Sequence, residues 1–202
     1  MKHATRFLAA LALLAASASF AAATPTTWKI DPAHTEAGFE VRHFFAKVHG
    51  VFHDVDGTIV FDEADPAAIK IEAMTKVRSI DTGEKKRDAH LQSSDFFNAD
   101  KDSILAFKST KVVKLDKGKY KITGDLTMRG VTKTVTFDAE FLGSSAVSVE
   151  GQSWGSKAGF AATTVVNRKD WGINWNKTLD NGGVMVDDNV TIILNVEANK
   201  AQ

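Results

Sequence analysis

The chain of 202 residues contains no cysteine. This absence excludes a disulfide framework and a lipid anchor on an N-terminal cysteine, so a folded domain must be held together by its core. A phosphate-binding loop and a dinucleotide-binding glycine motif are missing too, and the glycines fall in expected turns. Internal repeats and low-complexity tracts are also lacking, which favours one ordinary globular domain.

An excess of charge of either sign is lacking as well. The chain has 25 basic and 25 acidic residues, and loss of a leader containing Lys2 and Arg6 would leave a net charge of −2. Nucleic acids and anionic membrane surfaces require clustered lysine and arginine. The charge balance therefore argues against both as the main partner.

Long apolar runs are absent except near the N-terminus, where residues 7–20 follow Lys2 and Arg6 and precede three alanines. This pattern is typical of a signal peptide, and the run is short for a transmembrane helix. We predict a cleaved leader over residues 1–23 and a single soluble domain over residues 24–202. Export without cysteines or an anchor points to a bacterial periplasm.

Three consecutive segments, at residues 105–115, 120–128 and 131–141, alternate between apolar and polar side chains. Such alternation indicates half-buried strands, and the short turns between them keep the apolar face on one side. The cross-strand pairs expected from the turn lengths are Leu115 with Tyr120, Phe107 with Met128, Met128 with Val131, and Ile122 with Phe137. A meander with one continuous apolar face has to cover that face or curl around it.

Further strands are predicted at residues 35–43, 47–61, 70–77, 158–166 and 190–198, a short helix at 84–94 and a loop at 143–155. The fold class is therefore all-β, and we predict a closed antiparallel barrel of eight strands with the helix between strands 3 and 4. One end of this barrel gathers aromatic and ionic side chains. This suits the mouth of an apolar cavity that holds a guest with a long apolar tail and a polar end.

Several motifs resemble the YceI-like family. They are Trp28-Lys29-Ile30-Asp31-Pro32-Ala33-His34-Thr35 with Phe39-Glu40-Val41-Arg42-His43, Gly57-Thr58-Ile59-Val60-Phe61-Asp62, Arg87-Asp88-Ala89-His90-Leu91 with Phe96-Phe97, the run from Gly124 to Lys133, and Asn167-Arg168-Lys169-Asp170-Trp171-Gly172. The resemblance implies a periplasmic, lipocalin-like barrel that binds a long isoprenoid or similar amphiphilic lipid. Trp171 stands where the family often has phenylalanine, and this larger ring is expected to affect the tunnel length or the head group.

From this resemblance and from strand parity we expect a binding or carrier protein that needs no cofactor and performs no chemical step; its ligand would be a polyisoprenoid or quinone-like lipid. The residues expected at the ligand are Phe39, Val41, His43, Phe44, Phe45, Arg87, His90, Phe96, Phe97, Phe107, Ile122, Leu126, Arg129, Val135, Phe137, Phe160, Arg168 and Trp171. Transient contact with a membrane or membrane protein and pairing of two copies stay open.

Three other functions also stay open. His49 and His53 invite a metal site, but along a regular strand they lie roughly 13 Å apart, too far to share one ion. A lipid-ester hydrolase would have to use groups such as Ser93, Ser94, His90 and Asp88, which are crowded into one segment. Structural pairing of Arg87, Asp88 and His90 that pins this loop is the favoured explanation. A protein-interaction module would bind through the aromatic rim, because barrel closure removes free strand edges.

Overall fold

The computed structural model describes residues 25–180 and 182–202, so the expected leader at residues 1–23 lies outside the described residues. The strands are β1 (Thr26–Ile30), β2 (Glu36–His43), β3 (Ala46–Phe52), β4 (Val55–Phe61), β5 (Lys70–Lys76), β6 (Ile80–Asp81), β7 (Ile104–Lys114), β8 (Lys119–Met128), β9 (Val131–Val149), β10 (Gln152–Asn167) and β11 (Val186–Lys200). The helices are α1 (Lys85–Gln92) and the 3₁₀ turns η1 (Pro66–Ala68), η2 (Val77–Ser79) and η3 (Arg168–Trp171).

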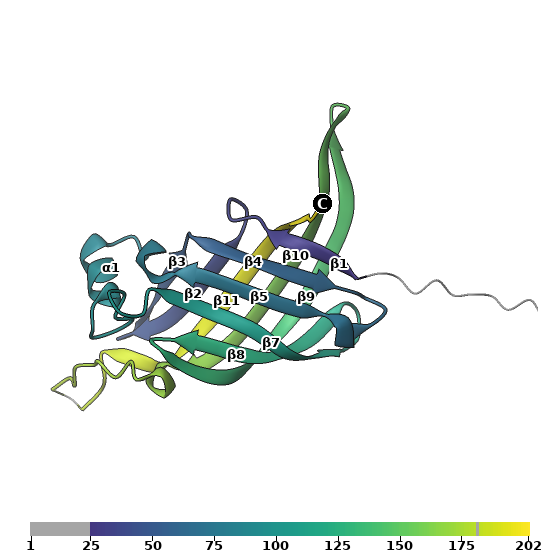
Figure 1. Cartoon of the computed structure of the whole chain (residues 1–202). Coiled ribbons are helices and arrows are strands. Elements are labelled where there is room, and N and C mark those ends of the chain that lie inside the picture. Colours follow the sequence, from purple (N-terminus) through teal and green to yellow (C-terminus); the bar gives the residue numbers. More distant parts are fainter. Residues whose placement is uncertain (1–24, 181) are drawn as a thin grey trace, which may run out of the picture.

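Eight strands close into an antiparallel barrel in the order β1-β4-β5-β7-β8-β9-β10-β11 (Figure 1). The ring closes where β1 pairs with β11, with Trp28 opposite Lys200. Strands β2, β3 and β6 extend the same sheet from β11. Because β1 and β2 both pair with β11, they act as one long strand interrupted at residues 31–35. The predicted all-β fold and eight-stranded closed barrel are confirmed.

The register of the central meander follows the predicted alternation for one of its two turns. Met128 lies opposite Val131 and Ile122 lies opposite Phe137 across the tight turn at Arg129 and Gly130. Both central turn residues have positive φ, 49° and 70°, which is the geometry of a two-residue turn whose twist matches the strands. This turn therefore keeps the apolar face of β8 and β9 pointing into the barrel.

The predicted register of β7 against β8 is wrong. Phe107 pairs with Leu126 instead of Met128, and two shifts of one residue each produce this difference. At the turn, Lys114 and not Leu115 pairs with Tyr120, and a bulge between Ser109 and Lys111 then inserts one extra residue into β7. The extra residue reverses the inside and outside faces beyond it. Val113 and Leu115, expected inside, are about 40% exposed.

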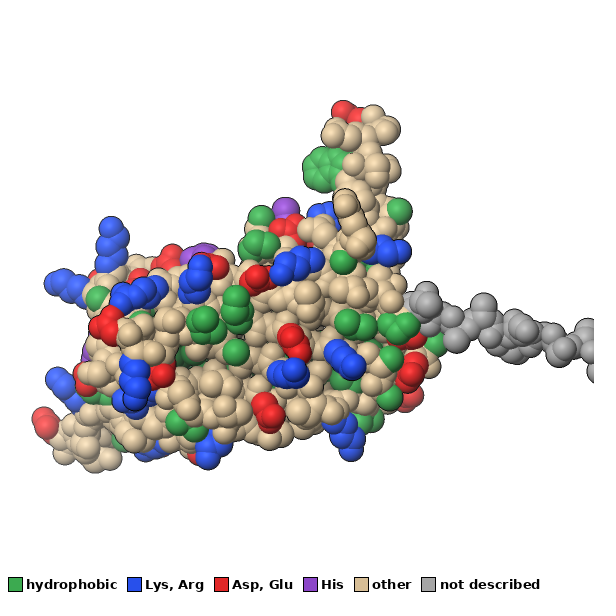
Figure 2. Space-filling view, viewed as in Figure 1, with side chains coloured by type: hydrophobic (Ala, Val, Ile, Leu, Met, Phe, Trp, Pro, Cys, Tyr) green, Lys and Arg blue, Asp and Glu red, His purple; other side chains and the backbone are tan. Residues whose placement is uncertain are grey.

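The prediction of a loop at residues 143–155 is also wrong. It continues β9 and β10 into a hairpin that projects from the barrel (Figure 1). Its backbone pairs Ser145 with Lys157 and Val149 with Gln152, so small polar residues extend the ladder without needing a core. Glu150 is the only charged residue between Gly143 and Ser156, whereas blue and red side chains are scattered over the visible barrel wall (Figure 2).

The connections separate onto two ends of the barrel. The helix α1, the segment from it to β7 and the long segment before β11 gather at one end (Figure 1). The predicted helix at residues 84–94 is confirmed as α1, which begins after Glu84, whose carboxylate accepts a hydrogen bond from the Lys86 amide at 3.0 Å. The turn after β4, the turn before β8 and the base of the projecting hairpin belong to the opposite end.

Candidate functional site

The barrel encloses a cavity of about 580 Å³. This volume is within the range of about 300–1,000 Å³ that is common for small-molecule sites. Most of its wall consists of inward-facing aliphatic and aromatic side chains from the strands, and alanines such as Ala73, Ala139 and Ala162 leave room between them. The interior is therefore hollow, although two clusters of buried side chains pack around it.

Thirteen of the side chains named from sequence lie at this wall. They are Phe39, Val41, His43, Arg87, His90, Phe96, Phe97, Phe107, Ile122, Leu126, Phe137, Phe160 and Arg168. They come from segments spread over more than 120 positions of the chain, and barrel closure brings them together. Contact between any of them and a ligand stays a prediction.

The other five named residues lie away from the cavity wall. Phe45 is 97% exposed at the β2–β3 turn, and the neighbouring Phe44 has a positive φ and packs its ring on His43. Val135 packs into the buried cluster that contains Leu126, and Trp171 is buried there at 2% exposure. Arg129 donates hydrogen bonds to the carbonyl oxygens of Gly172 and Ser94, so it fastens two loops together.

Trp171 has a structural role that its sequence position does not reveal. Trp171 is not among the residues that line the cavity, and its indole Nε1–H donates to the carbonyl oxygen of Leu126 at 3.1 Å. The ring therefore does not shorten the tunnel, and its expected effect on the head group stays a prediction. The aromatic ring that does border the cavity in this segment is Trp175. Sequence position alone could not show which of the two rings borders the cavity, because this depends on the chain path after η3.

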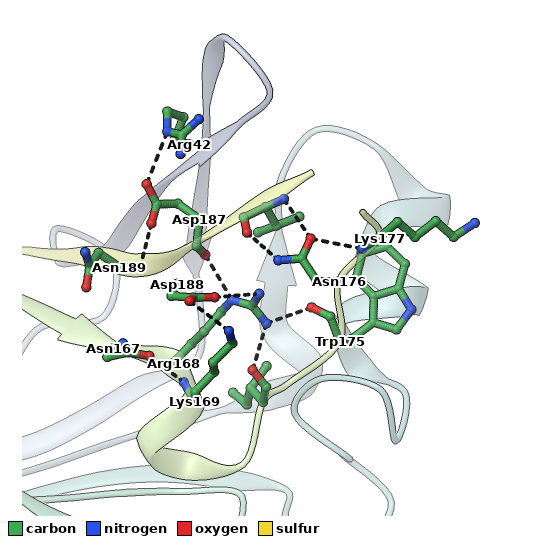
Figure 3. A network of polar contacts seen from close by, with 12 residues as sticks. Arg42, Asn167, Arg168, Lys169, Trp175, Asn176, Lys177, Asp187, Asp188 and Asn189 are labelled. Carbon is green, nitrogen blue, oxygen red and sulfur yellow. Dashed lines mark hydrogen bonds and ion pairs between the residues drawn. The ribbon is translucent and has the colours of Figure 1, made fainter. Parts of the chain in front are cut away.

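The end of the cavity beside α1 is held by a network around Arg168 (Figure 3). Arg168 is 4% exposed and donates to the carbonyl oxygens of Ile173, Trp175 and Asp187 at 2.7–2.9 Å. Its Nη2 also pairs with the Asp188 carboxylate at 3.3 Å. Burial lowers the pKa of the guanidinium, and the two aspartates oppose this effect. These contacts hold residues 172–176 against the start of β11.

Two further basic side chains at this end, Arg87 and His90, already have partners. Arg87 donates to the hydroxyl and the carbonyl oxygen of Thr82, both at 2.7 Å. His90 packs edge-on against the rings of Phe96 and Trp175 and pairs with the Asp95 carboxylate at 3.0 Å. Both side chains are therefore used to position a loop or a ring at the mouth.

The hydrolase arrangement considered from sequence is not assembled in this segment. The Ser93 hydroxyl donates to the backbone oxygen of His90 at 2.7 Å, while the imidazole faces Asp95. Asp88 accepts from the amide and hydroxyl of Thr82. Arg87, Asp88 and His90 thus make structural contacts, but with Thr82 and Asp95 and not with one another as expected.

Residues 151–155, Gly-Gln-Ser-Trp-Gly, match the spacing of a hydrolase nucleophile elbow. That motif functions at a sharp turn from a strand into a helix. Here it follows the turn between two antiparallel strands in the projecting hairpin, where Ser153 accepts a hydrogen bond from the Gly155 amide at 3.3 Å. The match therefore lacks the structural context that would give it chemical meaning.

A group of metal-ligating side chain types occurs outside the cavity, and it is not the pair His49 and His53 considered from sequence. Asp31, His34 and Glu197 bring ligand atoms within 4.8 Å of one another. The Lys157 ammonium lies 3.5 Å from Asp31 and 3.3 Å from Glu197. A cation from the chain itself thus balances these carboxylates where β1 passes into β2.

Within residues 25–180 and 182–202, no helix has the length and apolarity needed to cross a membrane.

Comparison with known proteins identifies the family. A YceI-like domain model matches residues 28–198. A UPF0312 protein of Photorhabdus laumondii is 41% identical over 164 residues, covering 79% of this chain and 80% of the relative. The crystal structure of the Campylobacter jejuni YceI protein is 33% identical, with a TM-score of 0.67 over 85% of this chain and 96% of that one.

A third similarity extends the comparison at the level of the fold alone. A polyisoprenoid binding domain from Saccharophagus degradans is 10% identical and aligns with a TM-score of 0.62 over 87% of this chain and 99% of that domain. At this identity the likeness shows a shared barrel. From the match over residues 28–198 and the relatives that are more than 30% identical, this chain belongs to the YceI-like family.

Proposed function

We propose that this protein is an exported, periplasmic carrier or sequestering protein that holds a long-chain isoprenoid or similar amphiphilic lipid in its barrel. The observation that carries the proposal is the cavity of about 580 Å³ with a mostly apolar wall. Burial of hydrocarbon contributes roughly 0.8 kcal/mol per methylene group. A long tail would therefore bind tightly with few polar contacts.

The arrangement at the mouth supports binding without a chemical step. The serine, histidine and aspartate side chains there are engaged in separate structural pairs, and Arg168 and Arg87 have their hydrogen bonds satisfied by the chain itself. The name of the Saccharophagus degradans domain favours an isoprenoid as the ligand class. We therefore propose a carrier that acts without a cofactor and without a chemical step.

The direct test is gentle purification of the protein, extraction with organic solvent and mass spectrometry of the extract. We expect one lipid per protein molecule, with a polyprenyl or quinone-like chain. Recovery of a stoichiometric metal with no lipid would overturn the proposal, and release of a free acid from an added lipid ester would replace it with the hydrolase alternative.

A matched pair of variants locates the lipid. Ala162 lines the cavity, whereas Val165 on the same strand is 62% exposed. Ala162→Phe should fill part of the lumen and reduce the recovered lipid at least fivefold, and Val165→Phe should leave it unchanged. Equal lipid recovery from both folded variants would show that the ligand binds elsewhere.

A further inference from the structure

The cavity contains a buried polar group that no part of the described chain satisfies. Tyr120 is 3% exposed and lines the cavity, and its hydroxyl oxygen has no hydrogen-bond partner among the described residues. An unsatisfied buried hydroxyl costs about 1–3 kcal/mol. Phenylalanine would fill the same space without that cost. The presence of the hydroxyl group therefore calls for a functional explanation.

Tyr120 lies at the end of the cavity away from α1. It is the second residue of β8, and Met128 at the other end of this strand adjoins the turn that contacts the mouth loops. Eight residues of strand span about 26 Å, or about 20 Å along the axis of a tilted barrel. Its ring packs edge-on against Phe61 at 5.9 Å between centroids, and Phe61 contacts Phe141 and Phe160. We call this aromatic group the deep end.

The second described side chain with an unpartnered buried polar atom provides a contrast. The indole nitrogen of Trp28 also lacks a partner, but Trp28 packs inside a buried cluster with Ile30 and Ile59 and is not part of the cavity wall. Among the described residues, the Tyr120 hydroxyl group is therefore the buried, unpartnered donor on a side chain that lines the cavity.

The charges around the deep end select the type of acceptor. Burial, and to a smaller extent the Glu63 charge, raises the pKa of Tyr120. Glu63 is itself paired with the Lys114 ammonium at 3.6 Å, so the charges beside the ring largely balance. The phenol thus stays protonated at neutral pH and remains a donor. The lysine and arginine residues of the wall, Lys86, Arg87 and Arg168, belong to the mouth. A phosphate at the deep end would be far from the cations that line the cavity, whereas an uncharged oxygen needs only the phenol as a donor.

We propose that Tyr120 forms a polar subsite at the deep end, where its hydroxyl donates a hydrogen bond to an uncharged oxygen of the bound lipid, as in an alcohol, a ketone or a quinone. The inference rests on the proposed lipid-binding function and specifies the ligand class: a lipid with a neutral acceptor on the end that enters first. A lipid with only a phosphate head would leave this donor unused.

Tyr120 is the only tyrosine of the chain, which gives the test a single signal. Delipidated full-length mature protein labelled with ¹³C at tyrosine Cζ is titrated with a long-chain methyl ketone, the alkane of equal length and the matching alkyl phosphate. We expect the resonance to move with the ketone and to stay in place with the alkane. The ketone should bind about 2–10-fold more tightly than the alkane, the worth of one ordinary hydrogen bond.

The isosteric variant Tyr120→Phe separates the hydroxyl group from the ring. It should bind the alkane as the wild type does, lose the preference for the ketone and unfold at no lower temperature, because it removes an unsatisfied polar atom. Equal wild-type affinity for ketone and alkane, a preference that persists in Tyr120→Phe, or tightest binding of the phosphate would overturn the subsite. Failure of all three lipids to bind the wild type would instead overturn the proposed function.

Discussion

The ring of Phe107 lies directly over Gly124 on the neighbouring strand. A Cβ atom added to Gly124 would stand 2.4 Å from Phe107 Cζ and 2.5 Å from the backbone oxygen of Lys108. The same relationship recurs between Phe39 and Gly50, where the added Cβ would be 2.4 Å from the ring. Each glycine thus provides the space in which a large wall ring lies flat, so the lumen stays open beside it.

We expect Gly124→Ala to lower the free energy of unfolding by about 1–3 kcal/mol, because overpacking forces the ring or the backbone to shift. Gly159→Ala is the control, since its added Cβ would meet Leu142 at an ordinary 3.4 Å and should change stability by less than about 0.5 kcal/mol. Urea denaturation of both variants measures the difference. Equal stability would show that Phe107 is free to move away.

Arg168→Met should destabilise the protein by about 3 kcal/mol, because it leaves three carbonyl oxygens and the Asp188 carboxylate without their buried donor. Amide hydrogen exchange should also become faster between residues 172 and 180. Exchange and urea denaturation measured on the same sample test whether this one side chain holds the mouth segment.

Lys169→Met is the matched control for that variant. Lys169 pairs with the same Asp188 at 2.8 Å, but its side chain is 45% exposed. Exposed ion pairs contribute about 0–1 kcal/mol, so this change should be small. If both variants lost equal stability, charge and not the buried hydrogen-bond geometry of Arg168 would be responsible.

Trp171→Phe should lower stability by about 1–3 kcal/mol while leaving lipid affinity within twofold of wild type. The reason is that the variant loses the hydrogen bond to Leu126 and some buried area in the wall. Trp175→Phe is the comparison, because Trp175 borders the cavity and should change affinity more than stability. Lipid titration measures the affinity and thermal unfolding the stability of both variants. A larger loss of affinity in Trp171→Phe together with a larger loss of stability in Trp175→Phe would contradict this assignment.

Asp31 should make stability depend on pH in the acid range. A hydrogen bond from His34, with smaller contributions from the Ala33 amide and Asn199, lowers the pKa of Asp31 from 3.8 to about 2. A lowered folded-state pKa gives stability that is complete above about pH 4 and is lost as the pH falls towards 2. The contribution of this largely shielded carboxylate is about 1–2 kcal/mol.

The measurement compares wild type with Asp31→Asn in urea at pH 5, 4, 3 and 2. The stability gap between them should narrow by about 1–2 kcal/mol over that range. Asp100→Asn, which removes an exposed ion pair with Arg78, should cost less than about 1 kcal/mol at every pH. A stability difference between wild type and Asp31→Asn that does not change with pH would show that ionisation of the Asp31 carboxylate does not stabilise the folded state.

Much of the barrel could be predicted from alternation because a strand has a period of two and a tight turn preserves the face. The Met128–Val131 register followed from two residues in a turn. The same reasoning failed across β7 and β8, because a bulge near Thr110 leaves no distinct signature among alternating residues. Strand β1 was missed as a strand, since five residues are too few to show a period.

The sequence likewise predicted only part of the candidate site. Parity placed Ile122 and Phe137 inside, and both line the cavity. Parity could not show that Trp175 borders the cavity and Trp171 does not, or which basic side chains at the mouth hold loops together. These distinctions depend on the chain path outside regular strands. Tyr120 was recognised as inward-facing, but only the coordinates reveal that its hydroxyl group has no partner.

The sequence by itself determined the all-β class, the inward face of most strands and the family, because these depend on local periodicity and on motifs along the chain. Only the tertiary structure shows that the lumen is hollow, at which positions aromatic rings of its wall pack over glycines, and which polar groups have hydrogen-bond partners. Those properties arise from contacts between residues far apart in sequence, whose distances no local pattern records.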